Sequence, residues 1–403
     1  MAPKRNNNGK EKANSSKKST RKILVTAGEG QTGRLIIDLL ATDEDYVNKY
    51  DELTALVFSE QAKSILQEYD TVKTVVYDPK DEEMLVKTMS MVDTCLLIPP
   101  ARKDKAKITR TLLEAARKAQ SVQNLVLLSS AGADYAERDK QPRLREFIDL
   151  EALAMQPKGD ASTGDTGHSP CVIRAGFYAE NLLLYSKQAQ GEGKLPLPIG
   201  ENHKFAPIAL GDVAQLAAYV ITSEGPHGLA DNVRSQVIIA TGPQLTAGPE
   251  LAVAASQALG TKMEFESIDE DTAKKILNSE QGEEIDEAER EYLLEYYSLV
   301  REGKTNYTAT TAMLAYFGHR GQEPTEFFQT YSAEFKPKKR RTTKNASTEG
   351  TTQKTGTRAS ARGKQSSTAA TASKNEIVDD IDMEAEDEGA VVEKGRRTVT
   401  KGL

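Results

Sequence analysis

The chain has 403 residues, of which 38% are hydrophobic and 28% are charged, so it carries enough apolar material for a large core. Its net charge of -7 excludes no partner by itself, because residues 1–22 carry eight bases against one acid while residues 376–388 carry eight acids and no base. No stretch approaches the roughly 20 apolar residues that span a bilayer, and the N-terminus lacks the apolar core of a secretory signal, so we expect a cytoplasmic location, a nuclear one, or both.

Short apolar strands alternate with amphipathic helices between residues 21 and 175, after a basic tail over 1–20 that is predicted to be disordered. The first strand covers 23–27, and a helix follows over 34–41. Further strands are predicted over 53–58, 74–77, 94–98, 124–129 and 172–175, and further helices over 61–69, 81–89 and 103–119. This alternation predicts an α/β fold with a doubly wound parallel sheet, so we assign 21–175 to a Rossmann domain.

The pattern changes after Ala175. Helices are predicted over 177–190, 211–223, 249–259 and 285–300, with an extended piece over 194–198 and a strand over 237–241. We assign 176–335 to a small α+β cap region that covers the C-terminal edge of the sheet. One stripe of the last helix gathers large apolar side chains, which predicts core packing. The stripe consists of Ile285, Ala288, Tyr292, Tyr296 and Leu299.

Residues 336–403 are predicted to form a second disordered tail, because their composition cannot repay the entropy of ordering. A basic cluster over 336–344 begins the tail and resembles a nuclear import signal, so an import receptor or another protein is a candidate partner. Non-specific contact with nucleic acid is the other interpretation. No aromatic residues are interleaved with the basic ones, so base stacking and sequence-specific nucleic-acid binding are not expected.

The two cysteines, Cys95 and Cys171, each lie in an apolar run that reads as a buried strand. Neither has metal-ligand spacing with another cysteine or a histidine, so no metal site is expected. We predict two buried free thiols, as in proteins of a reducing compartment.

The segment Gly28-Glu29-Gly30-Gln31-Thr32-Gly33 joins the first strand to the first helix. A pyrophosphate can approach the backbone closely there, because glycines present no side chain and the helix N-terminus offers free N–H groups and a positive dipole. The third glycine lets the helix pack tightly on the strand. A plain tight turn is the alternative, but the strand and helix on either side favour a dinucleotide site, so 21–175 is predicted to bind NAD or NADP. The predicted cofactor residues in the turn are Gly28, Gly30, Gln31, Thr32 and Gly33.

The end of the second strand leaves the choice between NAD and NADP open. An acid there would hold the ribose hydroxyls, and an arginine would hold a 2′-phosphate. The chain has Phe58 where a basic residue is expected, followed by Glu60, which could hold a ribose, and by Ser59 and Lys63, which could hold a phosphate. An ordinary exposed turn explains the same residues.

Two residues after later strands are candidate lining residues of the cofactor site. Asp78 follows the third strand, where the adenine edge lies in such folds, and Pro99 follows the fourth, where the chain must bend away from the cofactor. Each also has a simple turn explanation.

Several segments, in the right order over about 22–320, resemble the NmrA-like family of atypical short-chain dehydrogenases. Besides the glycine-rich turn, whose first family glycine falls on Ala27, they are Leu96–Pro100, Val126–Asp134, Arg174–Leu182, Phe205–Ala214 and Ala240–Thr246. The resemblance implies a Rossmann fold and an NAD(P) cofactor. The residues expected to line a substrate pocket are Ser130, Phe177, Asn181 and Phe205.

The Tyr-x-x-x-Lys pair that typical short-chain dehydrogenases use for proton transfer is missing after the fifth strand. Tyr135 is followed four residues later by Asp139. In some NmrA-like members a lysine lies four residues before a glutamate that resembles Glu151, which puts Phe147 at the lysine position. The sequence therefore identifies no catalytic acid.

Two functions remain open at this stage. The first is an NAD(P)H-dependent reductase of a small hydrophobic carbonyl, quinone or imine, because the nicotinamide itself is the reductant and the protein need only position it. The second is a non-enzymatic NAD(P) redox sensor that engages a protein partner. The NmrA-like family contains both kinds of protein.

Overall fold

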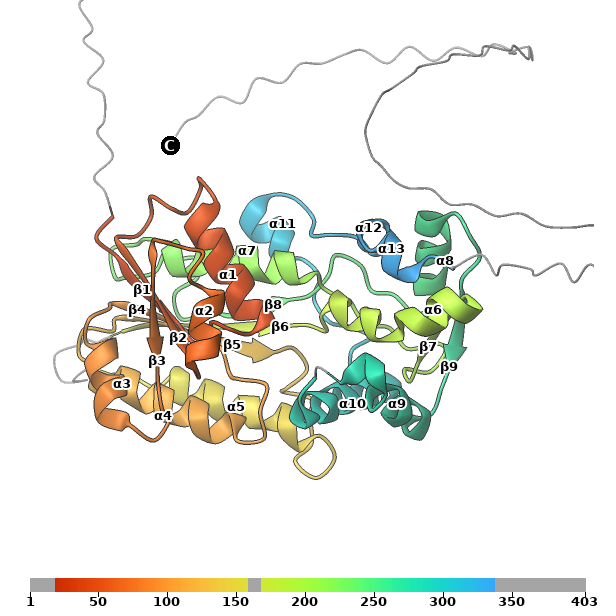
Figure 1. Cartoon of the computed structure of the whole chain (residues 1–403), viewed down its shortest axis with the longest axis horizontal. Helices are drawn as coiled ribbons and strands as arrows, with labels where there is room; N and C mark the ends of the chain where they lie inside the picture. The colour runs from red at the N-terminus through yellow and green to blue at the C-terminus, as the bar shows by residue number, and fades with distance from the viewer. Residues whose placement is uncertain (1–18, 159–167, 284, 338–403) are drawn as a thin grey trace, which may run out of the picture. The chain divides into compact units, whose positions relative to one another are not determined.

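The computed structural model of the chain describes residues 19–158, 168–283 and 285–337 (Figure 1). The predictions for the N-terminal tail up to residue 18, for the basic cluster from residue 338 onward and for the acidic stretch lie outside the described residues. In the described part, no helix is both long enough and apolar enough to cross a bilayer.

The centre of the described chain is a seven-stranded sheet in which every neighbouring pair of strands is parallel. In spatial order the strands are β3 (Val72–Val76), β2 (Glu52–Val57), β1 (Lys22–Val25), β4 (Thr94–Leu97), β5 (Asn124–Ser130), β6 (Ser169–Ala175) and β8 (Val237–Ala240). The order reverses between β1 and β4, and ligands of such sheets bind at this switch point, outside the carboxyl ends of the strands. The predicted doubly wound parallel sheet is confirmed.

Helices cover both faces of the sheet (Figure 1). On one face α1 (Gln31–Thr42) and α7 (Leu210–Thr222) share a hydrophobic core with β1 and β6, and α2 (Glu60–Ile65) adds Ala62 to it. On the other face α3 (Glu82–Met89), α4 (Lys105–Lys118) and α5 (Pro142–Ala154) enclose a second core. Both cores form because strands that are buried on both faces consist almost entirely of apolar residues.

Cys95 and Cys171 are free and fully buried in the sheet, which confirms the prediction. Burial raises the pKa of both thiols to about 12. Since the thiolate is the reactive form, neither cysteine is a nucleophile near neutral pH.

The chain after β6, together with Ala136 and Leu144, forms a third core that is rich in aromatic rings. Two short strands, β7 (Lys194–Leu197) and β9 (Glu264–Ser267), pair in parallel beside it. The helical elements around this region are η2 (Ala179–Tyr185), α6 (Ser186–Glu192), α8 (Gly248–Leu259), α9 (Glu270–Leu277), η3 (Glu280–Gly282), α10 (Glu287–Arg301), α11 (Ala312–Phe317), α12 (Pro324–Thr330) and α13 (Ser332–Phe335).

The helix predicted over 177–190 begins later than expected and starts as a 3₁₀ helix, η2. The backbone at Phe177 and Tyr178 is extended instead, because Ile208 pairs with it. The Ile208 N–H donates to the Phe177 carbonyl at 2.9 Å, and the Ala179 N–H donates to the Ile208 carbonyl at 2.8 Å. This non-local pairing overrides the local helical pattern.

Candidate functional site

The glycine-rich turn lies at the carboxyl end of β1, and its glycines serve different purposes. A Cβ on Gly33 would stand 2.2 Å from the Ala27 carbonyl oxygen, so α1 can pack on the turn only without one. Gly28 is buried, and a Cβ there would press on three core side chains at 3.1 to 3.3 Å, so this glycine serves packing and lines neither cavity described below. Gly30 is exposed and borders open space.

Ala27, at the position of the family's first glycine, adopts a left-handed backbone conformation with φ of +50°. This region of backbone space favours glycine, because a Cβ crowds the following carbonyl oxygen. The turn therefore retains the family's backbone shape although the residue differs.

The first turn of α1 offers unpaired N–H groups. The Gly30 N–H donates to the Ala27 carbonyl and the Arg34 N–H donates to the Gly30 carbonyl, but the amides of Gln31, Thr32 and Gly33 have no acceptor in the described part of the chain. No side chain caps the helix either. Three free amides at the positive end of a helix form an anion-binding site.

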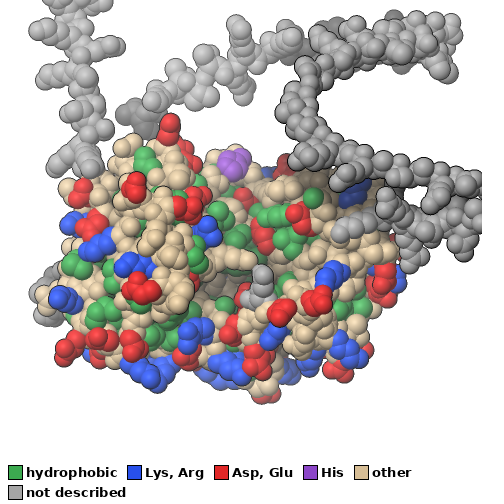
Figure 2. Space-filling model, viewed as in Figure 1, with side chains coloured by type: hydrophobic (Ala, Val, Ile, Leu, Met, Phe, Trp, Pro, Cys, Tyr) green, Lys and Arg blue, Asp and Glu red, His purple; other side chains and the backbone are tan. Residues whose placement is uncertain are grey.

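These amides border a wide cavity of about 890 Å³, called the outer cavity here. Its wall includes Gly30, Gln31, Thr32 and Gly33, together with Pro99 after β4. The structure therefore brings together most of the residues that were predicted to hold a cofactor. Figure 2 shows the surface hollowed between the sheet and the helices that follow β6.

Ser59 and Asp78, which are also predicted to hold the cofactor, do not line the outer cavity. The Ser59 hydroxyl accepts a hydrogen bond from the Ala62 N–H at 3.0 Å and so caps α2. Asp78 is exposed and accepts from the Lys80 N–H at 2.9 Å, which closes a turn. Each side chain thus has a local backbone partner, as the simpler explanation expects, and its role in cofactor binding stays a prediction.

A different set of side chains gathers at the end of β2. The Glu29 carboxylate accepts from the Phe58 N–H at 3.1 Å with one oxygen, and its other oxygen is buried and accepts no hydrogen bond in the described part of the chain. The Phe58 ring packs on Tyr77 at 4.8 Å between ring centres, and the Arg102 guanidinium lies over the same ring at 5.0 Å. An acid and a base thus flank the place where a dinucleotide's adenosine ribose lies in such sheets.

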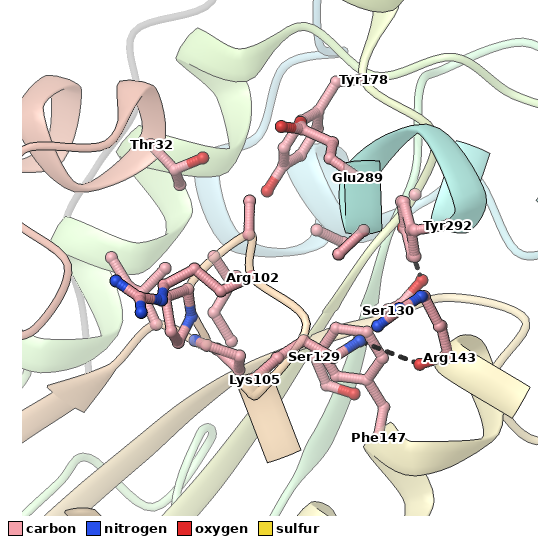
Figure 3. Close-up of a pocket in the computed structure, with 18 residues that line it drawn as sticks. Thr32, Arg102, Lys105, Ser129, Ser130, Arg143, Phe147, Tyr178, Glu289 and Tyr292 are labelled. Atoms are coloured by element: carbon pink, nitrogen blue, oxygen red, sulfur yellow. Dashed lines mark hydrogen bonds between the residues drawn. The ribbon is translucent and has the colours of Figure 1, made fainter. Parts of the chain in front are cut away.

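A second, smaller space of about 150 Å³, called the inner pocket here, opens beside the outer cavity (Figure 3). The ends of β4, β5 and β6 form its floor, and α4, α5 and α10 supply side chains from farther along the chain. Seven residues line both spaces, so the two adjoin and share a wall. They are Thr32, Ile98, Pro99, Pro100, Ala101, Tyr178 and Glu289.

The two serines at the end of β5 have separate roles. Ser129 donates to the Glu151 carboxylate at 2.5 Å, and Glu151 also holds Arg174 through two hydrogen bonds of 2.9 and 2.8 Å. This network ties β5, β6 and α5 together. The Ser130 hydroxyl instead lies 2.9 Å from the Tyr292 hydroxyl within the inner pocket, as Figure 3 shows.

Tyr292 reaches the pocket because α10 is docked on the start of α5. The Glu295 carboxylate accepts from the backbone N–H groups of Arg143 and Leu144 at 3.2 and 2.9 Å and so caps α5. Burial raises the pKa of Tyr292 to about 12, and the Ser130 hydrogen bond partly offsets that shift. Tyr292 packs against the aromatic core, as predicted, and also lines the inner pocket, whereas Tyr296 and Leu299 of the same stripe are fully buried in that core.

Lys105 of α4 is a pocket residue that sequence reasoning missed. Only 6% of it is exposed, its Nζ donates to the Arg143 carbonyl at 2.9 Å, and it lies 4.0 Å from the centre of the Phe147 ring. Phe147 thus has an ammonium group over it that comes from another helix. A signal was present in the sequence, because Lys105 precedes Ile108 by three residues and Leu112 by seven and so shares their buried stripe.

The predicted substrate residues fall into three places. Ser130 lines the inner pocket, and Asn181 lines the outer cavity beside the glycine-rich turn. Phe177 and Phe205 line neither space, because their rings contact each other at 5.3 Å in the aromatic core. We therefore reassign both phenylalanines to packing.

Comparison with known proteins gives matches over most of the chain. An "NAD(P)H azoreductase" of Xenophilus azovorans is 26% identical over 255 residues, which is 63% of this chain and 80% of that protein. Among solved structures, an NADPH-dependent quinone oxidoreductase of Escherichia coli superposes with a TM-score of 0.61 at 21% identity, covering 77% of this chain and 99% of the other. A triphenylmethane reductase of Citrobacter sp. superposes with a TM-score of 0.60 at 19% identity over the same shares.

The likeness to solved structures at these identities concerns the fold, which is the same parallel sheet with helices on both faces. The family is established by sequence, because the model of the NmrA-like family matches residues 19–308. That range includes the glycine-rich turn, Ser130, Lys105 and Tyr292. The chain belongs to the NmrA-like family.

Proposed function

We propose that the protein is an NAD(P)H-dependent reductase that binds the dinucleotide in the outer cavity and a small, flat, apolar acceptor in the inner pocket. The observation that carries this proposal is that the two spaces adjoin, since Thr32, Pro99 and Tyr178 line both of them. A molecule that extends from the amides of α1 across this junction reaches the mouth of the pocket.

The residues of the outer cavity fit a dinucleotide. The amides of Gln31, Thr32 and Gly33 can receive the pyrophosphate, and Gly30 leaves the approach to them open. When bound in its reduced form, the nicotinamide supplies a hydride. The protein binds the dinucleotide and the acceptor, orients them toward each other and excludes water from the space between them.

The inner pocket suits an acceptor with a flat apolar body and one polar atom. Leu128, Phe147 and Tyr292 provide apolar walls, and the hydroxyl pair of Ser130 and Tyr292 provides polar contacts. The acceptor classes we propose are carbonyl compounds, quinones, imines and azo compounds. The names of the matched proteins, which refer to azo compounds, quinones and triphenylmethane dyes, support acceptors of this kind.

The test combines binding and turnover on the full chain. NADH and NADPH are titrated by calorimetry, and oxidation of each is followed with menadione, methyl red and malachite green as acceptors. We expect binding of at least one dinucleotide and turnover of at least one acceptor. Gly30→Trp should abolish both, because the indole would fill the entrance to the α1 amides, where a Cβ meets only the Ala27 carbonyl at 3.4 Å.

Gly191→Trp is the matched control, since a Cβ on this exposed glycine meets nothing within 4 Å. No binding at millimolar dinucleotide would refute the proposal. Tight binding without turnover of any acceptor would instead favour the non-enzymatic dinucleotide sensor, the alternative function.

A further inference from the structure

Lys105 is buried in the wall of the inner pocket, although a lysine on a helix of this kind normally reaches solvent. Its side chain is 8% exposed. An ammonium that leaves water loses hydration free energy, which only close partners can restore. The burial of the Lys105 ammonium therefore suggests that it contacts something inside the pocket.

The partners of Lys105 do not use all of its hydrogen-bonding capacity. One N–H donates to the Arg143 carbonyl, and the Glu146 carboxylate lies 3.8 Å away, at ion-pair distance. An ammonium has three N–H groups, and its third close neighbour among the described residues is the face of the Phe147 ring at 4.0 Å, which attracts the charge but offers no oxygen or nitrogen acceptor. A polar atom of a molecule in the pocket can provide one.

The same small space contains the paired hydroxyls of Ser130 and Tyr292. The Lys105 Nζ lies 5.9 Å from the centre of the Tyr292 ring, and Figure 3 shows the labelled side chains of Lys105, Ser130 and Tyr292 around one cavity. A hydroxyl pair can hold an acceptor atom by hydrogen bonds, and a neighbouring ammonium can both stabilise negative charge on that atom and give it a proton.

We propose that Lys105 is a catalytic residue, the proton donor of the reduction, with Ser130 and Tyr292 orienting the acceptor. This inference rests on the proposed reductase function. The acceptor takes a hydride, with its two electrons, from the reduced dinucleotide at one atom of its double bond. As the π bond breaks, the oxygen or nitrogen at the other atom forms a bond to a proton of Lys105, which is left as a neutral amine.

The structure also offers a route by which Lys105 regains its proton. Glu146 lines a separate groove on the outside of α5 and α10, so its carboxylate lies between solvent and the Lys105 amine. A proton from water can therefore return through Glu146 without crossing the inner pocket.

The surroundings of Lys105 make its proton easy to lose. The groups that face it are Arg143 and Glu146 of α5 and Tyr292 and Glu295 of α10. Burial outweighs the two carboxylates and lowers the pKa of Lys105 to about 8, so the ammonium is charged at neutral pH and is a stronger acid than a lysine in water.

The experiment compares the full-length protein with Lys105→Met, Lys105→Arg and the control Lys107→Met, which removes an exposed lysine from the same helix. Menadione turnover with saturating dinucleotide is measured across the pH range. We expect the wild-type kcat to fall above about pH 8, where Lys105 loses its proton. Lys105→Met should lower kcat at neutral pH by about 100-fold, an effect within the range expected for the loss of a general acid. The same variant should remove the fall of kcat above about pH 8.

Lys105→Arg separates proton donation from charge alone, because a guanidinium stays charged and does not release its proton. A rate equal to wild type in this variant would show that only the charge matters and would overturn the proposal. Equal rates and equal pH profiles in wild type and Lys105→Met would also overturn it while leaving the reductase function intact. Absence of turnover in the wild type would refute the reductase function itself.

A second measurement needs neither dinucleotide nor variant. Trace acetylation of the free protein at a series of pH values, followed by mass spectrometry of the peptide that contains Lys105, reports how the amine titrates. We expect reactivity that levels off about two pH units earlier than for exposed lysines. Titration together with the exposed lysines would contradict the proposed environment of Lys105.

Discussion

The outer cavity and the inner pocket are built in different ways. The part of the outer cavity that we propose to bind phosphate is made of backbone amides from one short segment at the start of α1. The inner pocket is made of side chains from α4, β5, α5 and α10, and the pair Ser130 and Tyr292 is separated by 162 positions in the sequence. A backbone site can be encoded by one local motif, whereas a side-chain site exists only when distant elements are packed together.

The comparison predicts that the largest effect comes from a substitution in the backbone site. Gly33→Ala places a Cβ 2.2 Å from the Ala27 carbonyl oxygen, and a backbone atom cannot move aside as a flexible side chain can. We expect the free energy of unfolding to fall by about 3 kcal/mol and dinucleotide binding to be lost. Urea denaturation and calorimetry measure the two effects. Gly30→Ala is the control, and equal stability of the two variants would contradict the packing argument.

The burial of Lys105 in the inner pocket should make the free energy of unfolding depend on pH. Lys105 has a pKa of about 8 in the fold against 10.5 for an unperturbed lysine, so between these values the unfolded chain binds more protons and stability rises with pH. The difference between the two pKa values corresponds to a gain of roughly 3 kcal/mol in the free energy of unfolding. This gain is absent below about pH 8 and complete above about pH 10.5. Urea denaturation of wild type and Lys105→Met across this range isolates the contribution, and parallel curves would contradict it.

A smaller effect is expected from Glu29, a side chain at the end of β2 that lies outside the lining of both cavities. Glu29→Gln removes a carboxylate that would repel a 2′-phosphate, while the amide can still accept from the Phe58 N–H. We expect the affinity for NADPH relative to NADH to rise about fivefold, since such a repulsion is worth about 1 kcal/mol. Calorimetry with both dinucleotides tests this, with exposed Glu44→Gln as the control. An unchanged ratio would exclude Glu29 as a determinant of cofactor choice.

The smallest effect is expected at Ala27. Its φ of +50° is strained for alanine, so Ala27→Gly should raise the free energy of unfolding by about 0.5 kcal/mol, after the greater freedom of glycine in the unfolded chain is subtracted. Thermal or urea unfolding measures it. Ala41→Gly within α1 should act in the opposite direction, because glycine weakens a helix. A loss of stability in Ala27→Gly would mean that its Cβ contributes more by packing than it costs in strain.

Much of the sheet could be predicted from the sequence. Short apolar runs such as 94–98 and 124–129 are unambiguous where a strand is buried on both faces, and the glycine-rich turn identifies the edge at which they end. Prediction was weaker where a contact distant in sequence sets the local backbone. Phe177 and Tyr178 have a helical pattern, yet pairing with Ile208 keeps them extended.

The amino-acid sequence by itself determined the family, the parallel sheet and the free amides of the first helix, because each depends on local apolar spacing or on glycines within a few residues. Only the tertiary structure decided that Lys105, Ser130 and Tyr292 share one pocket and that Phe177 and Phe205 do not line it. The physical reason is that the environment of a side chain depends on which elements pack against its own. The docking of α10 on α5 through Glu295, rather than any spacing within α10, turns Tyr292 toward Ser130.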